Sequence, residues 1–225
     1  MPNKLIVVTG GTKGIGRAII EKFAAQGFDI ATTARKLDNL QELKLDIETR
    51  FANVNLNFIA ADLSVKSEVE KFGKFVLDLE QPIQILVNNT GFFVPGQIHS
   101  EAEGQLELMI NTNLYSAYYL SRALINGMIV QKSGHVFNIC STASTMPYVN
   151  GGSYCISKFA LYGMTKVLRE EMKAYNIKVT AILPGATKTA SWDGVNLPDE
   201  RFVKASDVSE AIFSAYSLSL IHISE

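Results

Sequence analysis

The opening residues constrain the fold most, because an apolar run leads into a glycine-rich turn and then into a helical pattern. The run Lys4–Val8 (KLIVV) is short and rich in branched residues, which is typical of a buried parallel strand. The turn 9–16 reads TGGTKGIG, and the amphipathic pattern of 17–26 stops at Gly27. Strand, glycine turn and helix in this order predict the opening of a dinucleotide-binding unit.

Three glycines of this turn have separate expected tasks. Gly10 permits a tight turn, Gly14 lets the backbone approach a pyrophosphate, and Gly16 lets the helix pack closely on the strand. The free N–H groups at the helix N-terminus would then bind phosphate. The spacing is GxxxGxG instead of the common GxGxxG, and a glycine turn can also simply connect a strand to a helix. The turn alone therefore does not decide the function.

Strand-like and helix-like segments alternate along the rest of the chain. The pattern predicts further strands at 28–33, 54–60, 83–87, 135–140 and 177–183. It predicts helices at 39–51, 65–79, 153–174 and 205–217, and two helices within 103–129, the second starting near Asn113. We expect an α/β fold with a Rossmann-like, doubly wound parallel sheet and helices on both faces, as a single domain over 1–217. Ligands of such sheets bind beyond the carboxyl ends of the strands.

Composition excludes several function classes. Of 225 residues, 47% are hydrophobic and 19% are charged, with a net charge of −1, so neither a nucleic-acid nor a membrane surface is indicated. No apolar run has the length of a transmembrane helix, and we expect no signal peptide, because residues 1–4 lead directly into the first predicted strand. The chain has only two cysteines, Cys140 and Cys155, which favours reduced thiols in an intracellular protein, and we expect a cytoplasmic location. His99 and His135 have no metal-ligand spacing and are read as surface or strand-edge residues, so we expect no metal site.

A second informative feature is the pair Tyr154 and Lys158. On a helix these side chains lie one turn apart and face the same way. A phenol titrates near ~10, and lowering that pKa by roughly 3 units needs about 4 kcal/mol. One unit charge at about 4 Å supplies this energy at an effective dielectric constant of about 20. Lys158 could thus make Tyr154 a proton donor and acceptor near neutral pH, although an isolated YxxxK is more often an ordinary surface pair.

Six motifs together resemble one known family. In chain order they are Thr9-Gly10-x-x-x-Gly14-x-Gly16, Asn88-Asn89-Thr90-Gly91, Asn113, Ser141, Tyr154-x-x-x-Lys158 and Pro184-Gly185. From about Lys4 to about Ser217 the sequence is similar to the short-chain dehydrogenase/reductase family. The resemblance implies a nicotinamide-dependent oxidoreductase.

The resemblance also implies four catalytic residues. Tyr154 would exchange a proton with the substrate oxygen, and Lys158 would lower the Tyr154 pKa and bind the cofactor ribose. Ser141 would hydrogen-bond the substrate carbonyl, although a serine at a strand end is usually a turn residue. Asn113 would hold a relay water through its backbone, although an asparagine there is more often a helix cap.

Charges near the second strand indicate which dinucleotide is bound. No acid stands at the strand end; Arg35 follows it, and Lys13 lies in the glycine turn, which favours the 2′-phosphate of NADP(H). Alternatively, Arg35 and Lys36 are solvated loop charges and either cofactor is used. Asp62 matches the family position that contacts adenine, but it would equally cap the next helix. The expected cofactor-binding residues are Gly10, Thr12, Lys13, Gly14, Ile15, Gly16, Arg35, Asp62, Leu63, Asn89, Gly91, Tyr154, Lys158, Pro184, Gly185, Thr187 and Thr189.

These features predict an NADPH-dependent carbonyl reductase or alcohol dehydrogenase acting on a small ketone, aldehyde or alcohol. One alternative is a 3-oxoacyl-carrier-protein reductase, for which Arg122, Lys132 and Arg169 are candidate contacts to an acidic partner by charge alone. Another is a non-catalytic NADP-binding regulator, but such proteins typically lack the tyrosine or the lysine.

Three segments carry further expectations. Residues 190–204 are polar with Gly and Pro, which predicts a substrate lid with Trp192 at its mouth or fastening it to the body. The tail 218–225 resembles a translated sequencing adapter, so we expect it to be non-native and the last edge strand to be missing or replaced; a real short strand is the alternative. Helices near 115–129 and 159–168 are apolar on most faces, which with the resemblance implies a homodimer or homotetramer; burial within a monomer is the alternative.

Overall fold

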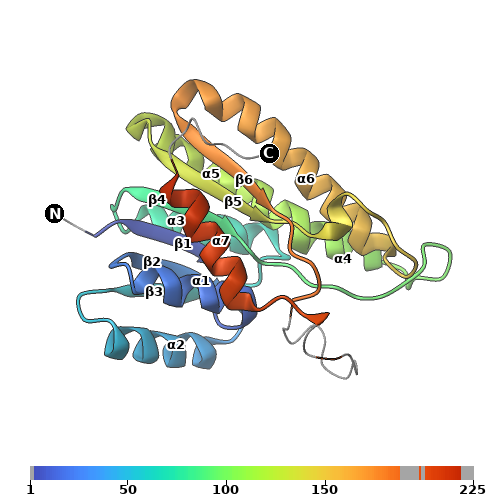
Figure 1. The fold of residues 1–225 in the computed structure, drawn as a ribbon, viewed down its shortest axis with the longest axis horizontal. Helices are drawn as coiled ribbons and strands as arrows, with labels where there is room; N and C mark the ends of the chain where they lie inside the picture. Colours follow the sequence, from blue (N-terminus) through green and yellow to red (C-terminus); the bar gives the residue numbers. More distant parts are fainter. Residues whose placement is uncertain (1–2, 188–197, 199–200, 219–225) are drawn as a thin grey trace.

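A parallel sheet forms the centre of the molecule. The computed structural model describes residues 3–187, 198 and 201–218. Within them, six parallel strands lie in the order β3-β2-β1-β4-β5-β6 (Figure 1). The chain therefore winds outward first on one side of β1 and then on the other, with the switch point between β1 and β4, as predicted for a doubly wound sheet. The strands are β1 Leu5–Thr9, β2 Asp29–Ala34, β3 Leu56–Ala60, β4 Ile83–Asn88, β5 Gly134–Ile139 and β6 Ile177–Ile182.

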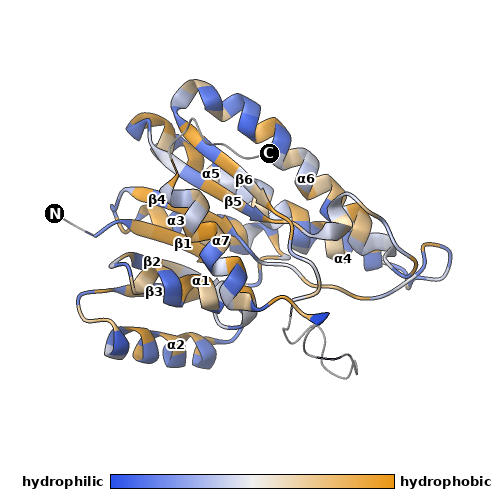
Figure 2. Cartoon of the chain, in the orientation of Figure 1, coloured by the Kyte–Doolittle hydropathy of each residue, from blue (hydrophilic) through white to orange (hydrophobic). Residues whose placement is uncertain are grey.

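Helices cover both faces of the sheet. Apolar residues of α1, α2 and α7 pack on one face, and those of α3, α5 and α6 on the other. Because both faces are covered, all five residues of β1 are buried, and Figure 2 shows this strand as mostly hydrophobic. The helices are α1 Gly14–Ala24, α2 Leu37–Arg50, α3 Lys66–Leu77, α4 Gln105–Ile110, α5 Ser116–Gln131, α6 Gly152–Met172 and α7 Ala205–Ser217.

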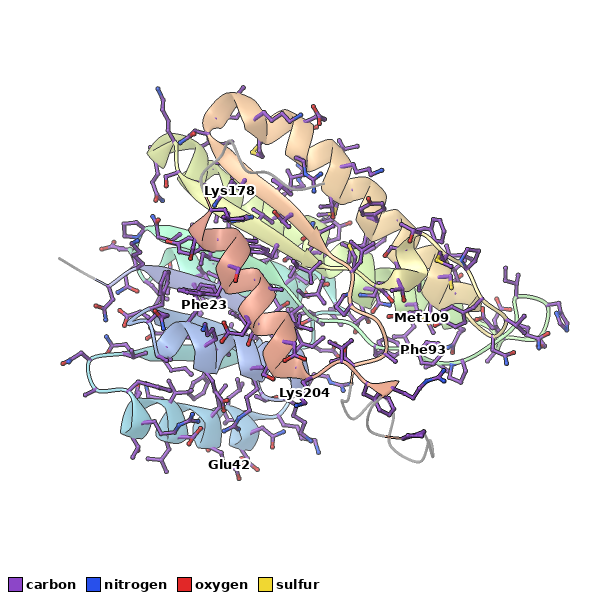
Figure 3. All side chains as sticks on the ribbon, in the orientation of Figure 1. Phe23, Glu42, Phe93, Met109, Lys178 and Lys204 are labelled. Carbon is purple, nitrogen blue, oxygen red and sulfur yellow. The ribbon has the colours of Figure 1, made fainter. Side chains whose placement is uncertain are left out.

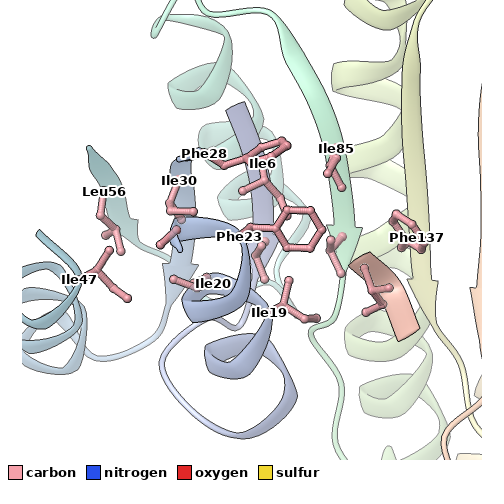
Figure 4. Packing of buried hydrophobic residues seen from close by; sticks show 14 of the residues in the cluster. Ile6, Ile19, Ile20, Phe23, Phe28, Ile30, Ile47, Leu56, Ile85 and Phe137 are labelled. Carbon is pink, nitrogen blue, oxygen red and sulfur yellow. The ribbon is translucent and has the colours of Figure 1, made fainter. Parts of the chain in front are cut away.

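Phe23 joins α1, α7 and the sheet. Figure 4 shows its side chain pointing from α1 over Ile6 of β1. Its ring meets Phe28 edge-on at 5.2 Å and Phe213 of α7 at 5.5 Å between centroids. Aromatic pairs in this geometry contribute about 0.5–1.5 kcal/mol each beyond their area burial. The last described helix is thus fastened to the first strand–helix unit, which holds the glycine turn.

The segment predicted as two helices within 103–129 is continuous. Between α4 and α5 the backbone forms one π-helical turn, Asn111–Tyr115, with Asn113 inside it and fully buried. Such turns insert an extra residue and are frequent at functional sites. Asn113 therefore neither begins a helix nor caps one; the turn aims its side chain inward.

The reading of His135 as a surface or strand-edge residue was wrong. It is buried in β5, which pairs with β4 and β6, and its Nε2 lies 2.8 Å from Thr180 Oγ1. Burial is the largest cause that lowers the pKa of His135 far below its ordinary value. A central strand of a covered sheet has no exposed face, which one polar residue in an apolar run does not reveal.

Several predictions fall on residues outside the described ones. They are most of the lid, including Trp192, the position Thr189, and nearly all of the tail that bears on a further edge strand. The base of the lid is described: Val203 N donates to Ala186 O at 2.8 Å, and Thr187 and Val203 form a parallel bridge. None of the described helices combines the length and hydrophobicity that crossing a membrane requires.

Candidate active site

The glycine turn between β1 and α1 has the predicted shape. Gly10 has a φ of +67°, a left-handed conformation that favours glycine. A Cβ on Gly16 would overlap the Gly10 carbonyl oxygen, so only glycine allows this close packing. Helix α1 begins at Gly14, three residues earlier than expected, and its N-cap residue Lys13 makes no side-chain cap. First-turn N–H groups and the positive end of the helix dipole are therefore available to an anion.

Two cations beside this turn have no carboxylate partner within the described residues. Lys13 and Arg35 are both exposed. Arg17, in contrast, contacts Glu21 at 3.0 Å and Asp46 at 2.7 Å. A phosphate at the end of β2 would therefore meet Lys13 and Arg35 without displacing an existing ion pair.

The end of β4 is tied to the glycine turn by Asn89. Its Nδ2 donates to Thr9 O at 2.8 Å and Gly10 O at 3.3 Å, and its backbone N donates to Thr9 Oγ1 at 2.9 Å. The side chain thus fixes the turn's position relative to the next strand of the sheet. Its predicted contact with a cofactor stays a prediction.

Asp62 follows β3 and forms a local turn. Its Oδ1 accepts hydrogen bonds from Ser64 N at 3.0 Å and Ser64 Oγ at 2.8 Å. Asp62 thus forms a local turn and does not cap α3, as the alternative had it, because the N-cap residue of α3 is Val65, which makes no side-chain cap. The next residue, Leu63, is buried.

Ser141, Tyr154 and Lys158 converge at the carboxyl end of β5. Lys158 Nζ lies 5.8 Å from the centroid of the Tyr154 ring, and the Ser141 side chain hydrogen-bonds Tyr154. Lys158 Nζ also donates to Ile139 O at 2.8 Å, which anchors α6 to the strand end. The predicted placement of the two side chains on one side of a helix is confirmed.

The protonation energetics differ from the expectation. Burial raises the pKa of Tyr154 and outweighs the lowering effect of its hydrogen bond with Ser141. Burial also lowers the pKa of Lys158 to about 8, against a smaller raising effect of Cys140. In the protein alone, the net pKa of Tyr154 is therefore above its ordinary value, because desolvation of the phenolate is the largest effect.

Asn113 connects three parts of the site. Its Oδ1 accepts from Phe92 N at 2.9 Å, while its Nδ2 donates to Phe92 O at 3.1 Å and to Ser157 Oγ at 2.9 Å. A Cβ on Gly91 would lie 3.1 Å from Asn113 Oδ1 and 3.4 Å from Lys158 Nζ, so Gly91 keeps this space open. The side chain therefore ties the loop after β4 to α6, a role that the sequence did not suggest. The predicted backbone role of Asn113 stays a prediction.

The segment after β6 lies next to Ser141 and borders the site there. Pro184 O accepts from Thr142 N at 3.1 Å, next to Ser141. Thr187 Oγ1 donates to Gly185 O at 3.1 Å. These residues lie at the same edge of the sheet as the glycine turn, as the motif order predicted.

The family model for short chain dehydrogenase matches residues 4–199. The chain belongs to the short-chain dehydrogenase/reductase family. It is thus a member of a family of oxidoreductases, with the parallel sheet that the sequence predicted.

Relatives within the family have several substrates in their names. The chain is 30% identical to a sepiapterin reductase of Chlorobaculum tepidum over 94% of this chain and 89% of the relative. It is 31% identical to a diacetyl reductase [(S)-acetoin forming] of Staphylococcus epidermidis over 96% and 83%. The structure of L-sorbose reductase from Gluconobacter frateurii, complexed with NADPH and L-sorbose, superposes with a TM-score of 0.88 at 26% identity, over 96% of this chain and 90% of that one.

Aromatic residues wall this dehydrogenase's site beside Tyr154. The Phe93 ring meets the Tyr154 ring edge-on at 4.9 Å between centroids, and Tyr148 lies 6.5 Å from Phe93. In Figure 3, Phe93 lies well away from Lys178, the second residue of β6. Phe93 therefore packs against the Tyr154 ring, and Tyr148 packs in turn against Phe93.

Two contributors to the site were not found from the sequence. Glu101 accepts hydrogen bonds from Ser153 N at 2.9 Å and from Ser153 Oγ, directly before Tyr154. The two residues are separated by 52 positions, and neither belongs to a motif with a known spacing. Only the path of the loop after β4 brings them together.

Proposed function

We propose that this dehydrogenase is an NADPH-dependent carbonyl reductase that acts on a small ketone or aldehyde and, in reverse, on the alcohol. The observation that carries the proposal is the convergence of Tyr154, Lys158 and Ser141 at the strand ends that also hold the glycine turn. A proton donor, a buried cation and a second hydroxyl then surround one space beside a phosphate cradle.

The residues present fit NADP(H). The uncapped start of α1 suits the pyrophosphate, and the unpaired Lys13 and Arg35 suit the 2′-phosphate. The related L-sorbose reductase is itself complexed with NADPH. Bound NADPH would supply the hydride. The residues proposed to hold it are Gly10, Thr12, Lys13, Gly14, Ile15, Gly16, Arg35, Asp62, Leu63, Asn89, Gly91, Tyr154, Lys158, Pro184, Gly185, Thr187 and Thr189.

The chain's own residues would handle the proton. Ser141 hydrogen-bonds the substrate oxygen and holds it near Tyr154, whose phenol donates the proton to that oxygen. Because the Lys158 pKa is about 8, its amine is mostly cationic near neutral pH and stabilises the phenolate left behind. Asn113 keeps the loop after β4 against α6, so the site stays closed around these groups.

The carrier-protein alternative lacks support from the described cations. Lys132 and Arg169 lie near the start of β6: Lys132 O accepts from Asn176, and Arg169 donates to Val179 O. This is the edge opposite the site. Arg122 on α5 is stacked on the Tyr118 ring. The regulator alternative is disfavoured because both Tyr154 and Lys158 are in place.

We also propose a homodimer or homotetramer. Apolar and aromatic side chains of the π-helical turn, α5 and α6 remain between 39% and 60% exposed in the single chain. A second copy covering them would remove this apolar surface from water. They are Tyr115, Tyr118, Ile156, Phe159 and Val167.

Turnover by the purified protein tests the proposed function. NADPH absorbance is followed with diketones, aldehydes, ketoses and acetoacetyl esters, with Tyr154→Phe as the control. We expect turnover with at least one small carbonyl compound and its near loss in the variant. Undiminished turnover in Tyr154→Phe would refute the assigned acid. A protein that binds NADPH yet reduces no compound of the panel would instead favour the regulator.

A further inference from the structure

A carboxylate outside the motifs caps the helix that carries Tyr154. Glu101 lies in the loop between β4 and α4, and Ser153 is the second residue of α6 and 1% exposed. Glu101 Oε1 accepts from Ser153 N at 2.9 Å, and Oε2 accepts from Ser153 Oγ. The residue following Ser153 in the helix is Tyr154.

The helix has no other side-chain cap at this end. Its N-cap residue is Gly151, which has no side chain, so the first N–H groups of α6 depend on a partner from elsewhere. Glu101 supplies that partner and places negative charge at the positive end of the helix dipole. A cap of this kind stabilises the first turn of its helix.

Two glycines make room for the carboxylate. A Cβ on Gly152 would overlap Glu101 Oε1, and a Cβ on Gly96 would lie 2.6 Å from Glu101 Cγ. Real Cβ atoms essentially never show such contacts. Gly96 in the loop and the start of α6 therefore close on the Glu101 side chain, and its position is determined by packing as well as by hydrogen bonds.

The same loop grips the start of α6 at further points. Gly96 N donates to Asn150 O at 3.0 Å, Gly96 bridges to Gly151, and Gln97 Nε2 donates to Asn150 Oδ1 at 2.9 Å. From the same loop, Phe93 meets the Tyr154 ring at 4.9 Å. Both the backbone before Tyr154 and the ring of Tyr154 thus contact the loop that Glu101 anchors.

We propose that Glu101 is a positioning residue for the proton transfer: through Ser153 it fixes the first turn of α6, so that the Tyr154 hydroxyl stays aligned with Ser141 and Lys158. This inference rests on the proposed function. Glu101 acts through Ser153 and the helix, not on the substrate. Small displacements of a reacting group can cost up to about 100-fold in rate, so a cap this close to Tyr154 has a kinetic effect.

The test compares Glu101→Ala and Glu101→Gln with Glu103→Ala. Glu103 is an exposed carboxylate two residues away that has no partner in the described structure, which makes it a matched control. We expect Glu101→Ala to lower kcat about 10- to 100-fold while the KM for NADPH changes less than about twofold. Glu101→Gln keeps an oxygen acceptor for Ser153 N and should recover kcat to within about threefold of the native value. Glu103→Ala should behave as the native protein.

A second measurement separates this inference from the proposed function. Amide hydrogen exchange over 150–158 should speed up in Glu101→Ala and in Ser153→Ala but not in Glu103→Ala. If the native protein reduces no carbonyl compound, the proposed function fails, and the exchange data still show whether Glu101 orders this turn.

Three outcomes would overturn the positioning role. They are a native kcat in Glu101→Ala, equal losses of kcat and NADPH affinity in that variant, and a Glu101→Gln variant as damaged as Glu101→Ala. If Glu101→Ala does not fold, Ser153→Ala and Glu101→Gln carry the test: unchanged kcat and unchanged exchange in Ser153→Ala would also overturn it.

Discussion

The two halves of the sheet build their parts of the site in different ways. On the β1–β2 side, the phosphate cradle consists of a glycine turn, an uncapped helix start and exposed cations, all within the first 35 residues. On the β4–β5 side, the groups proposed for proton transfer are buried or half-buried, and hydrogen bonds around them join segments 19 to 52 residues apart. Local chain geometry is enough to receive an anion from water, whereas holding a proton donor needs an enclosure made by distant segments.

The two halves also differ in the desolvation free energy of their charged groups. The cations of the cradle remain hydrated, so folding removes little of their hydration. Lys158 is 5% exposed, and burial lowers its pKa to about 8. The buried Lys158 charge on the β4–β5 side therefore destabilises the fold, whereas the exposed cations of the cradle do not.

The largest expected effect separates chemistry from binding. Tyr154→Phe removes only the phenolic oxygen, and general acid catalysis typically contributes about 10²- to 10⁴-fold, so kcat should fall by that factor. Affinity for NADPH, measured by fluorescence titration, should stay within about twofold because the cradle is untouched. A parallel loss of NADPH affinity would show that the two halves are not separable.

Removing the buried charge should stabilise the fold while stopping catalysis. The folded Lys158 pKa is about 8 against an ordinary 10.5, so its penalty is full below about pH 8 and is relieved as the pH rises toward 10.5. Near pH 7, Lys158→Met should raise the free energy of unfolding by up to about 3 kcal/mol, less about 1 kcal/mol for the lost hydrogen bond to Ile139. Urea unfolding near pH 7 and near pH 10 measures this difference, which should shrink at the higher pH. A variant less stable than the native protein at both values would contradict a destabilising effect of the buried charge.

A charge change in the cradle should act on binding alone. Arg35→Ala should weaken NADPH binding about tenfold and leave NADH binding nearly unchanged, because only NADPH carries the 2′-phosphate. Isothermal titration with both cofactors measures the difference, which added salt should reduce. The matched control is Arg50→Ala, an arginine already paired with Glu21 and Asp46. Equal weakening with NADH would argue against a 2′-phosphate contact.

The smallest effect concerns the aromatic wall. Phe93→Ala removes the edge contact with Tyr154, worth about 0.5–1.5 kcal/mol, so kcat should fall about 2- to 10-fold with NADPH affinity unchanged. Phe92→Ala is the control, since Phe92 binds Asn113 through its backbone and has no ring contact in the described structure. Steady-state kinetics with the best carbonyl substrate measures kcat for both variants. Equal losses of kcat in the two variants would contradict a specific contribution of the Phe93 ring.

Local features were predictable where one segment is sufficient. The glycine turn and the pairing of Tyr154 with Lys158 follow from the spacing of neighbouring residues. The strand order follows from alternation and handed crossovers. The burial of His135 and the π-helical turn at Asn113 did not follow, because each depends on which other elements pack against it.

The sequence by itself determined the family, the doubly wound sheet and the identity of the residues proposed to bind the cofactor and transfer the proton. These properties follow from short-range patterns of glycine, apolar and reactive side chains. Only the tertiary structure decided how those residues are held. Glu101 reaches Ser153 across 52 residues, and burial raises the Tyr154 pKa above its ordinary value. Desolvation and capping depend on neighbours that the chain brings together only when folded, so no local pattern encodes them.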